Sequence, residues 1–234
     1  MSLTVSVSGE VFERVPGLRL VVVAARGIAS IPHPHLPVSL FWRDAWQKVF
    51  GAGLRPTEQP HIQAYRHALK AAGIRIQEFP PAVEAIYRRA SKSSVPFSVS
   101  PLVDFYNACT LNHAMPVAGF DVDRVGSSLE LTVFEGGETF HGLGREMPEA
   151  VSTGEIGYRA GNTPLSRHFM WRQARSAALT KDTSNLILIT EAVEGVSHDA
   201  AMGMADALSK GVTRWFGATV RVVQLDATQP HAAV

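Results

Sequence analysis

The sequence predicts an α+β fold in which a mixed, mostly antiparallel sheet is flanked by helices. Two dense apolar runs, at Leu18–Ala25 and at 185–192, are typical of central strands, because such strands are buried on both faces. Between the two runs, apolar residues recur at helical spacing through residues 39–115. Strands, then clustered helices, then strands again indicate a layered α+β architecture.

The first half of the chain predicts two strands followed by a series of helices. Residues 2–8 alternate between polar and apolar side chains, which favours a half-buried strand ahead of Leu18–Ala25. Proline alternates with histidine at 32–35, and this pattern indicates an irregular loop. Helices are then expected at 39–51, at 59–72, at 81–91 and from Ser100 to about Met115.

The second half predicts short strands that are separated by glycine turns. These strands are expected at 128–134, 154–160, 165–171 and 185–192. A closing helix at 197–215 precedes a strand at Thr219–Leu225, and the tail 226–234 is expected to be frayed. Since the chain has no internal repeat and no Ser/Gly linker, we expect a single domain over residues 1–234.

Composition describes an ordinary globular protein. Hydrophobic residues make up 46% of the 234 residues and charged residues 18%, with a formal net charge of +1. A net charge this small gives no general attraction to nucleic acid, so any RNA contact must come from a local basic patch. The single cysteine, Cys109, excludes an internal disulfide and fits a reducing cytoplasm. Without an apolar stretch long enough to span a bilayer, we expect a cytoplasmic protein with no membrane association.

The stretch from Ser100 to Asp123 is the most informative part of the chain. Ser100 and the proline after it form a helix start, and Met115 before the next proline ends that helix. Gly119 is expected in the loop that follows. Asn107 and Asp104 are polar residues on this largely apolar helix, and buried polar groups need a partner. A ligand is one candidate for that partner.

This stretch also resembles a known family. The pattern VD..N....…P…(G)FD.D, the later segment from Trp171 to Glu191 (WRQ…LTKDTSN…E) and the pieces GGETF and GEIGY resemble the B3/B4 domain, the tRNA-editing module of the phenylalanyl-tRNA synthetase β subunit. The resemblance covers nearly the whole chain and implies a B3/B4-like fold. It implies that Asn107 and Glu191 hold a misattached amino acid and are the catalytic residues. The family pattern has a histidine at the position of Ala118, so this pocket departs from it.

The other candidate substrate-binding residues are assigned from the resemblance together with the chemistry of their side chains. Trp171, Arg172 and Gln173 put an aromatic beside a cation, a combination that suits base stacking and phosphate contact. Gly119 and Glu138 are assigned to the same pocket. A core role for Trp171 and a simple turn role for Glu138 remain open alternatives.

Basic residues gather at two places in the sequence. Arg88 and Arg89 end one predicted helix, where they also stabilise the helix dipole, and Arg172 and Arg175 lie in the second motif block. All four are candidate RNA-binding residues that would contact phosphates.

The sequence favours one function and leaves a second open. We expect a stand-alone editing protein that hydrolyses mischarged aminoacyl-tRNA in trans, with Asn107 and Glu191 in one cleft. The alternative is a non-catalytic module that binds tRNA or an amino-acid-like ligand. No cofactor and no metal are expected, because the histidines at 33, 35, 61 and 67 follow no metal-binding spacing. The absence of nucleotide-binding motifs argues against a complete synthetase.

Overall fold

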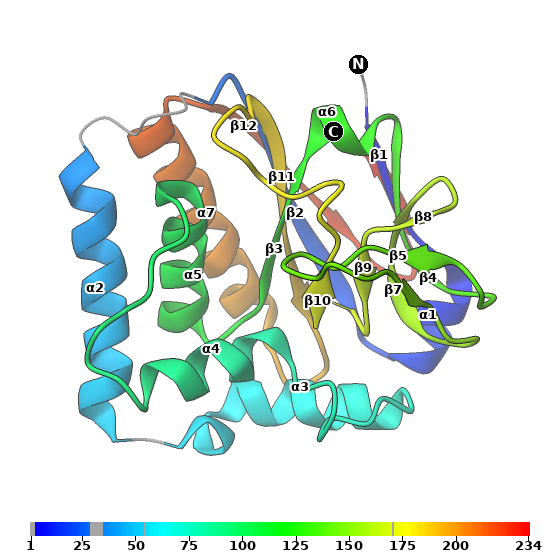
Figure 1. The fold of residues 1–234 in the computed structure, drawn as a ribbon, viewed down its shortest axis with the longest axis horizontal. Helices are drawn as coiled ribbons and strands as arrows, with labels where there is room; N and C mark the ends of the chain where they lie inside the picture. Colours follow the sequence, from blue (N-terminus) through cyan, green and yellow to red (C-terminus); the bar gives the residue numbers. More distant parts are fainter. Residues whose placement is uncertain (1–2, 29–34, 54, 170) are drawn as a thin grey trace.

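The computed structural model describes residues 3–28, 35–53, 55–169 and 171–234. It contains two main sheets that lie beside a group of helices (Figure 1). The predicted α+β class with mostly antiparallel pairing is confirmed. The expected loop at 32–34 lies outside the described residues. Within the described residues, no helix is long and apolar enough to cross a membrane.

The four-stranded sheet is antiparallel throughout and has the order β12-β2-β11-β3. Its strands are β2 (Arg19–Arg26), β3 (Val117–Asp121), β11 (Asn185–Ala192) and β12 (Thr219–Leu225). The two apolar runs of the sequence form the central strands β2 and β11, as predicted, because each has a partner strand on both sides.

The five-stranded sheet has the order β13-β1-β4-β7-β8, and its one parallel pair is β1 with β4. Its strands are β1 (Thr4–Val7), β4 (Ser128–Val133), β7 (Ile156–Ala160), β8 (Thr163–Pro164) and β13 (His231–Ala233). Two small ribbons complete the strands: β5 (Thr139–Phe140) with β6 (Glu149–Ala150), and β9 (Ser166–Arg167) with β10 (Arg172–Gln173).

The main helices cover one side and one end of the four-stranded sheet (Figure 1). They are α2 (His35–Ala52), α3 (Pro60–Ala71), α4 (Ala82–Ala90), α5 (Pro101–His113) and α7 (His198–Phe216). Three short helical segments lie elsewhere along the chain: α1 (Gly9–Arg14), η1 (Pro56–Glu58) and α6 (Val122–Val125). Ser100 and Ser197 cap α5 and α7 by accepting backbone N–H groups, which is the role that the sequence predicts for Ser100.

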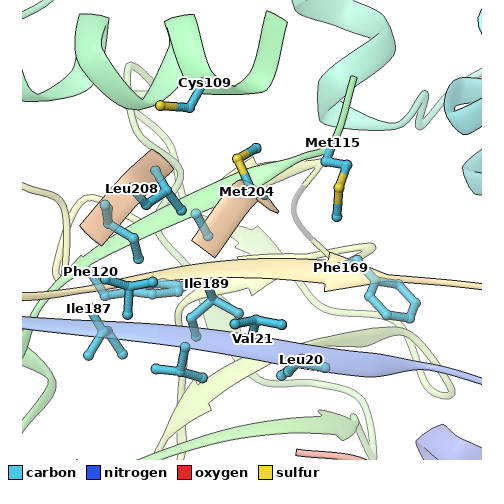
Figure 2. Close-up of a cluster of buried hydrophobic side chains, with 14 of the residues drawn as sticks. Leu20, Val21, Cys109, Met115, Phe120, Phe169, Ile187, Ile189, Met204 and Leu208 are labelled. Carbon is cyan, nitrogen blue, oxygen red and sulfur yellow. The ribbon is translucent and has the colours of Figure 1, made fainter. Parts of the chain in front are cut away.

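The sheet and the helices enclose a common apolar core. Figure 2 shows Cys109 of α5 with Met204 and Leu208 of α7 on one side of the strands, and Ile187 and Ile189 of β11 pointing to the other side. Cys109 is buried, and burial raises the pKa of its thiol to about 12. A thiol in this state is unreactive at neutral pH, so Cys109 is a packing residue.

Three expectations about local structure are wrong. Gly119 lies in β3 and not in a loop, because β11 offers the segment 117–121 a partner strand. Of the expected strand 165–171, only Ser166–Arg167 form a strand, β9, which pairs with β10 just beyond the expected range. The tail 226–234 is not frayed: β13 pairs with β1, and the N–H of Val234 donates to the carbonyl of Leu3 at 2.8 Å.

Candidate functional site

Glu191 lies near the end of β11 and its side chain is buried. The hydroxyl of Tyr158 donates to Glu191 Oε1 at 2.9 Å, and the hydroxyl of Tyr65 donates to the Glu191 backbone carbonyl. Burial raises the pKa of Glu191 from 4.5 to about 7, while the hydrogen bond from Tyr158 acts in the opposite direction. The carboxyl group therefore changes charge near neutral pH inside the protein core.

Asn107 lies on α5, on the other side of the four-stranded sheet. A Cβ at Gly119 would lie 3.3 Å from the Tyr106 ring of α5 and 3.3 Å from the Leu188 side chain, so these residues share the helix-facing side. Glu191 is three residues from Leu188, and alternation along the strand turns it to the opposite side, toward Tyr158. The expected cleft shared by Asn107 and Glu191 is therefore not formed.

The second motif block, by contrast, lies against the edge strand β3. The amide Nε2 of Gln173 donates to the backbone carbonyl of Gly119 at 2.5 Å. The Arg172 guanidinium lies 4.3 Å from the centre of the Trp171 ring, which is a cation–π distance. Trp171, Arg172 and Gln173 are all half-buried. Gln173 therefore contacts Gly119 directly, and Trp171 and Arg172 precede it in the same short segment. We call Gly119, Trp171, Arg172 and Gln173 the β3-edge cluster.

An ion-pair network that the sequence did not predict supports this cluster. Arg167 forms two hydrogen bonds with the buried carboxylate of Glu155, at 2.7 and 2.8 Å, and a third with Glu149 at 2.8 Å. Glu149 also accepts a bond from Arg172 at 3.1 Å. The bonds from Arg167 to Glu155 raise the pKa of Arg167. Because two arginines share Glu149, the ribbon of β9 and β10 is fixed to β6.

His168 occupies the turn of that ribbon in an unusual state. Its backbone has φ 44°, and Phe169 follows with φ 60°, values that non-glycine residues rarely adopt. The imidazole stacks on Phe79 with ring centres 3.7 Å apart, and Trp171 approaches it edge-on. Burial lowers the pKa of His168 to about 4, although Glu155 acts in the opposite direction. Both ring nitrogens are buried and have no hydrogen-bond partner within the described part of the chain.

The carboxylate of Glu138 is used within the turn that precedes it. It accepts the backbone N–H of Gly136 at 2.9 Å. Gly136 and Gly137 both have positive φ, and a Cβ at Gly136 would lie 2.3 Å from Thr153 Oγ1. These contacts match the turn alternative that the sequence left open for Glu138.

The buried carboxylates of the motif stretch also have local partners. Asp104 accepts bonds from Ser98 Oγ and from the backbone N–H of Val99, and so fixes the segment before α5. Asp121 accepts the hydroxyl of Thr183 at 2.6 Å, which links the two motif blocks of the sequence. These aspartates therefore hold the structure together, and no ligand is needed to explain their burial.

The four candidate RNA-binding arginines lie in two separate places. Arg172 and Arg175 follow the β3-edge cluster, and Arg175 is exposed with its guanidinium 3.4 Å from His141 Nδ1. Arg88 and Arg89 end α4 and line an open groove of about 580 Å³. The groove is also lined by Trp46, Lys92, Ser93, Val95 and Phe97.

The two arginines of α4 differ in how far they are already bound. Arg88 is paired at 2.5 Å with Glu84, a fully buried carboxylate that also binds Arg66 at 2.8 Å. Arg89 lies over the Phe97 ring at 5.0 Å and is exposed. Arg89 is consequently the freer of the two for a phosphate. Among the described residues, no group of three or more His, Cys, Asp or Glu side chains could hold a metal ion.

Comparison with known protein families identifies the family to which the chain belongs. The family model described as "B3/4 domain" matches residues 64–215. The chain belongs to the B3/4 domain family. The matched segment contains α5, β3 and the whole β3-edge cluster, so the residues that form the cluster lie within the part that defines the family.

A solved structure supports the same B3/4 fold. The chain is similar to an N-terminal fragment of the phenylalanyl-tRNA synthetase β subunit from Pyrococcus horikoshii, with a TM-score of 0.53 and 9% identity. The match covers 96% of this chain and 54% of the fragment, so this B3/4 chain spans about half the length of that fragment. No curated protein sequence matches the chain. At this identity the likeness establishes the fold alone.

Proposed function

We propose that this B3/4 protein binds the aminoacylated 3′ end of tRNA and hydrolyses the ester of mischarged tRNA in trans. One observation carries the proposal: Gln173, which directly follows Trp171 and Arg172 in the chain, binds the backbone carbonyl of Gly119 on β3, 54 residues away in sequence. An aromatic ring beside a guanidinium, next to a glycine backbone, suits a nucleotide end with its base, phosphate and attached amino acid.

Each residue of the cluster has a distinct part in this proposal. Trp171 stacks on the terminal base, and Arg172 adds positive charge beside the ring for the adjoining phosphate. Gln173, fixed by its bond to the Gly119 carbonyl, orients the ester. A water molecule then attacks the ester carbonyl carbon, the bond from that carbon to the ribose oxygen breaks, and the ribose hydroxyl and a free amino acid are released.

A non-catalytic binding module is the second candidate, and the position of Glu191 favours it. The Glu191 carboxylate faces Tyr158 on the side of the sheet away from α5, so it is not available to a substrate held near Asn107. Ala118 replaces the histidine of the family pattern, and its side chain shares the face of Glu191. The two candidate functions differ only in whether the bound ester is cleaved.

A deacylation assay over a panel of mischarged tRNAs tests the proposal. We expect turnover with at least one amino acid and tRNA pair, and we expect Trp171→Ala to weaken binding of that substrate about ten- to a hundredfold, because stacking on one base contributes that much. Arg172→Ala should weaken binding in the same direction. Affinity is measured separately by filter binding with uncharged tRNA.

The matched control for the arginine variant is Arg214→Ala, at an exposed position of α7 outside the cluster. This variant should retain full activity. Saturable binding without turnover of any substrate would favour the non-catalytic module. If neither binding nor turnover is found with the folded wild-type protein, both candidate functions fail.

A further inference from the structure

A second cavity lies among the helices, away from the β3-edge cluster. It has a volume of about 300 Å³ and lies where α2 and α5 end and α3 begins. Its polar lining comes from Lys48, Gln59, His61, Asn112 and His113. Its apolar wall comes from Val49, Ala52, Pro60, Tyr87, Leu111 and Ala114. The described lining contains one lysine and two histidines but no carboxylate.

The backbone carbonyls at this end of α5 are already bound. The hydroxyl of Tyr87 donates to the carbonyl of Leu111, and Nδ1 of His61 lies 3.0 Å from the carbonyl of His113. Because a carbonyl can only accept, His61 must carry its hydrogen on Nδ1.

The groups that line the cavity favour a negatively charged ligand. Burial lowers the pKa of His113 below 6.5, and the positive charges of His61 and Lys48 lower it further. This mutual effect means that the three cationic groups lie close enough to repel one another. The start of α3 adds to the positive potential, because no acidic residue lies in its first turn and no side chain caps it.

We propose that this cavity binds a phosphate group, either as inorganic phosphate or on a small phosphate ester. A tetrahedral anion matches a lining that presents one lysine and two histidines and no carboxylate. No tyrosine hydroxyl or carboxylate of the described lining competes with it, since the Tyr87 hydroxyl is bound to Leu111. This proposal is independent of the editing function, because the cavity shares no residue with the β3-edge cluster.

Proton linkage gives the site a characteristic pH dependence. The titratable or charged groups that face the cavity are Lys48 from α2, His61 from α3, Tyr87 from α4 and His113 from α5. The pKa of His113 is lowered by burial and by its positive neighbours, and the negative charge of a bound anion raises it again. The phosphate dianion should therefore bind more tightly at pH 6 than at pH 8, with uptake of a proton by His113.

Titration calorimetry with inorganic phosphate, at constant ionic strength, tests the proposal. We expect saturable binding of the wild-type protein that is tighter at pH 6 than at pH 8 when affinity is expressed for the phosphate dianion, because phosphate itself loses a proton between these pH values. After correction for the ionisation of phosphate, the binding enthalpy at pH 7 should vary with the ionisation enthalpy of the buffer in the direction of proton uptake. Lys48→Met should weaken phosphate binding about tenfold or more, because it removes a hydrogen bond from a charged donor.

The matched control is Lys70→Met, which removes one exposed lysine from the other end of α3 and leaves the cavity intact. It should bind phosphate as the wild type does. His113→Asn is a second cavity variant, for use if Lys48→Met is not folded by circular dichroism, and it should reduce the difference between pH 6 and pH 8. Malonate, a small dicarboxylate, serves as the competing probe and should bind more weakly than phosphate.

Three results would overturn the proposal. One is that the folded wild-type protein binds no phosphate at either pH. Another is that Lys48→Met and Lys70→Met lose affinity equally, which would mean that only the general charge of the surface acts. The third is that malonate binds as tightly as phosphate, which would assign the cavity to carboxylates.

Discussion

At the scale of single residues, Glu191 is the most unusual ionisable group of the fold. A carboxyl group with a pKa of about 7 in the core binds a proton more strongly than the same group in the unfolded chain, where the pKa is near 4.5. Stability therefore falls as the pH rises through the window from about 4.5 to 7, because the folded state must give up a proton that it holds more tightly. The total effect is at most about 3 kcal/mol.

Glu191→Gln should remove this dependence. Glutamine retains an oxygen that can accept the Tyr158 hydroxyl but never becomes charged, so we expect the variant to be more stable than the wild type at pH 8, by about 1–3 kcal/mol. At pH 4.5 the two proteins should be about equally stable. Urea unfolding at a series of pH values measures the difference.

The comparison between the two proteins is needed because other groups also titrate. His168, with its pKa lowered to about 4, destabilises the fold as the pH falls below about 6.5, but it does so equally in both proteins. Glu13→Gln, at an exposed position of α1, is the control and should follow the wild type. A Glu191→Gln variant that is less stable than the wild type at pH 8 would show that the carboxylate is stabilised there by its neighbours.

Residue type predicts only part of the candidate site. Trp171, Arg172 and Gln173 could be singled out because an aromatic, a cation and an amide stand together in the sequence. His168 could not, since its strained backbone and its stacking on Phe79 depend on the turn between β9 and β10. Glu191 was expected to share a cleft with Asn107, but the motif gives only its place in the chain and not the direction of its side chain, which faces Tyr158.

At the scale of elements, length and periodicity decide what the sequence can predict. The helices α2, α3, α4, α5 and α7 and the apolar strands β2 and β11 lie within a few residues of their expected bounds. The strands β3 and β13 were missed. Both are short edge strands, and each forms because its neighbour, β11 or β1, offers hydrogen bonds that local sequence does not reveal.

The helix α7 provides a test of packing at this scale. A Cβ at Gly211 would lie 2.2 Å from Phe105, whose ring is held among Phe41, Trp215 and Phe216. Gly211→Ala should therefore destabilise the protein by about 1–3 kcal/mol, because the aromatic cluster must shift. This cost exceeds the gain in helix propensity of about 1 kcal/mol. Thermal or urea unfolding measures the change.

Gly203→Ala on the same helix is the matched control. Gly203 is exposed, and the nearest atom to a Cβ there is Cε1 of His113 at 4.0 Å, an ordinary contact distance. We expect this variant to be stabilised by up to about 1 kcal/mol, because alanine favours the helix more than glycine does. If both variants were stabilised equally, the packing of Phe105 against α7 would be looser than the structure describes.

At the scale of the whole molecule, charge is nearly balanced and much of it is used internally. The chain has 22 Lys and Arg against 21 Asp and Glu. Arg88, Arg167 and Arg172 are each paired with glutamates. A surface of this kind gives little long-range attraction to RNA, so binding must rest on a few cations that remain free. Arg175 near the β3-edge cluster and Arg89 with Lys92 in the α4 groove are such exposed cations.

The salt dependence of tRNA binding tests which of these places the RNA contacts. With two or three phosphates bound, log Kd should change with log salt concentration with a slope of magnitude about 2. The double variant Arg172→Ala/Arg175→Ala should weaken binding across tRNA sequences and lower the slope by about 1, since Arg175 is free while Arg172 is already paired with Glu149. Arg89→Ala/Lys92→Ala is the matched variant, because it removes the same charge without leaving the buried Glu84 unpaired. We expect it to retain the wild-type slope.

If instead only this second variant loses affinity, the RNA lies along the α4 groove. If neither variant loses affinity, the protein has no role in binding tRNA.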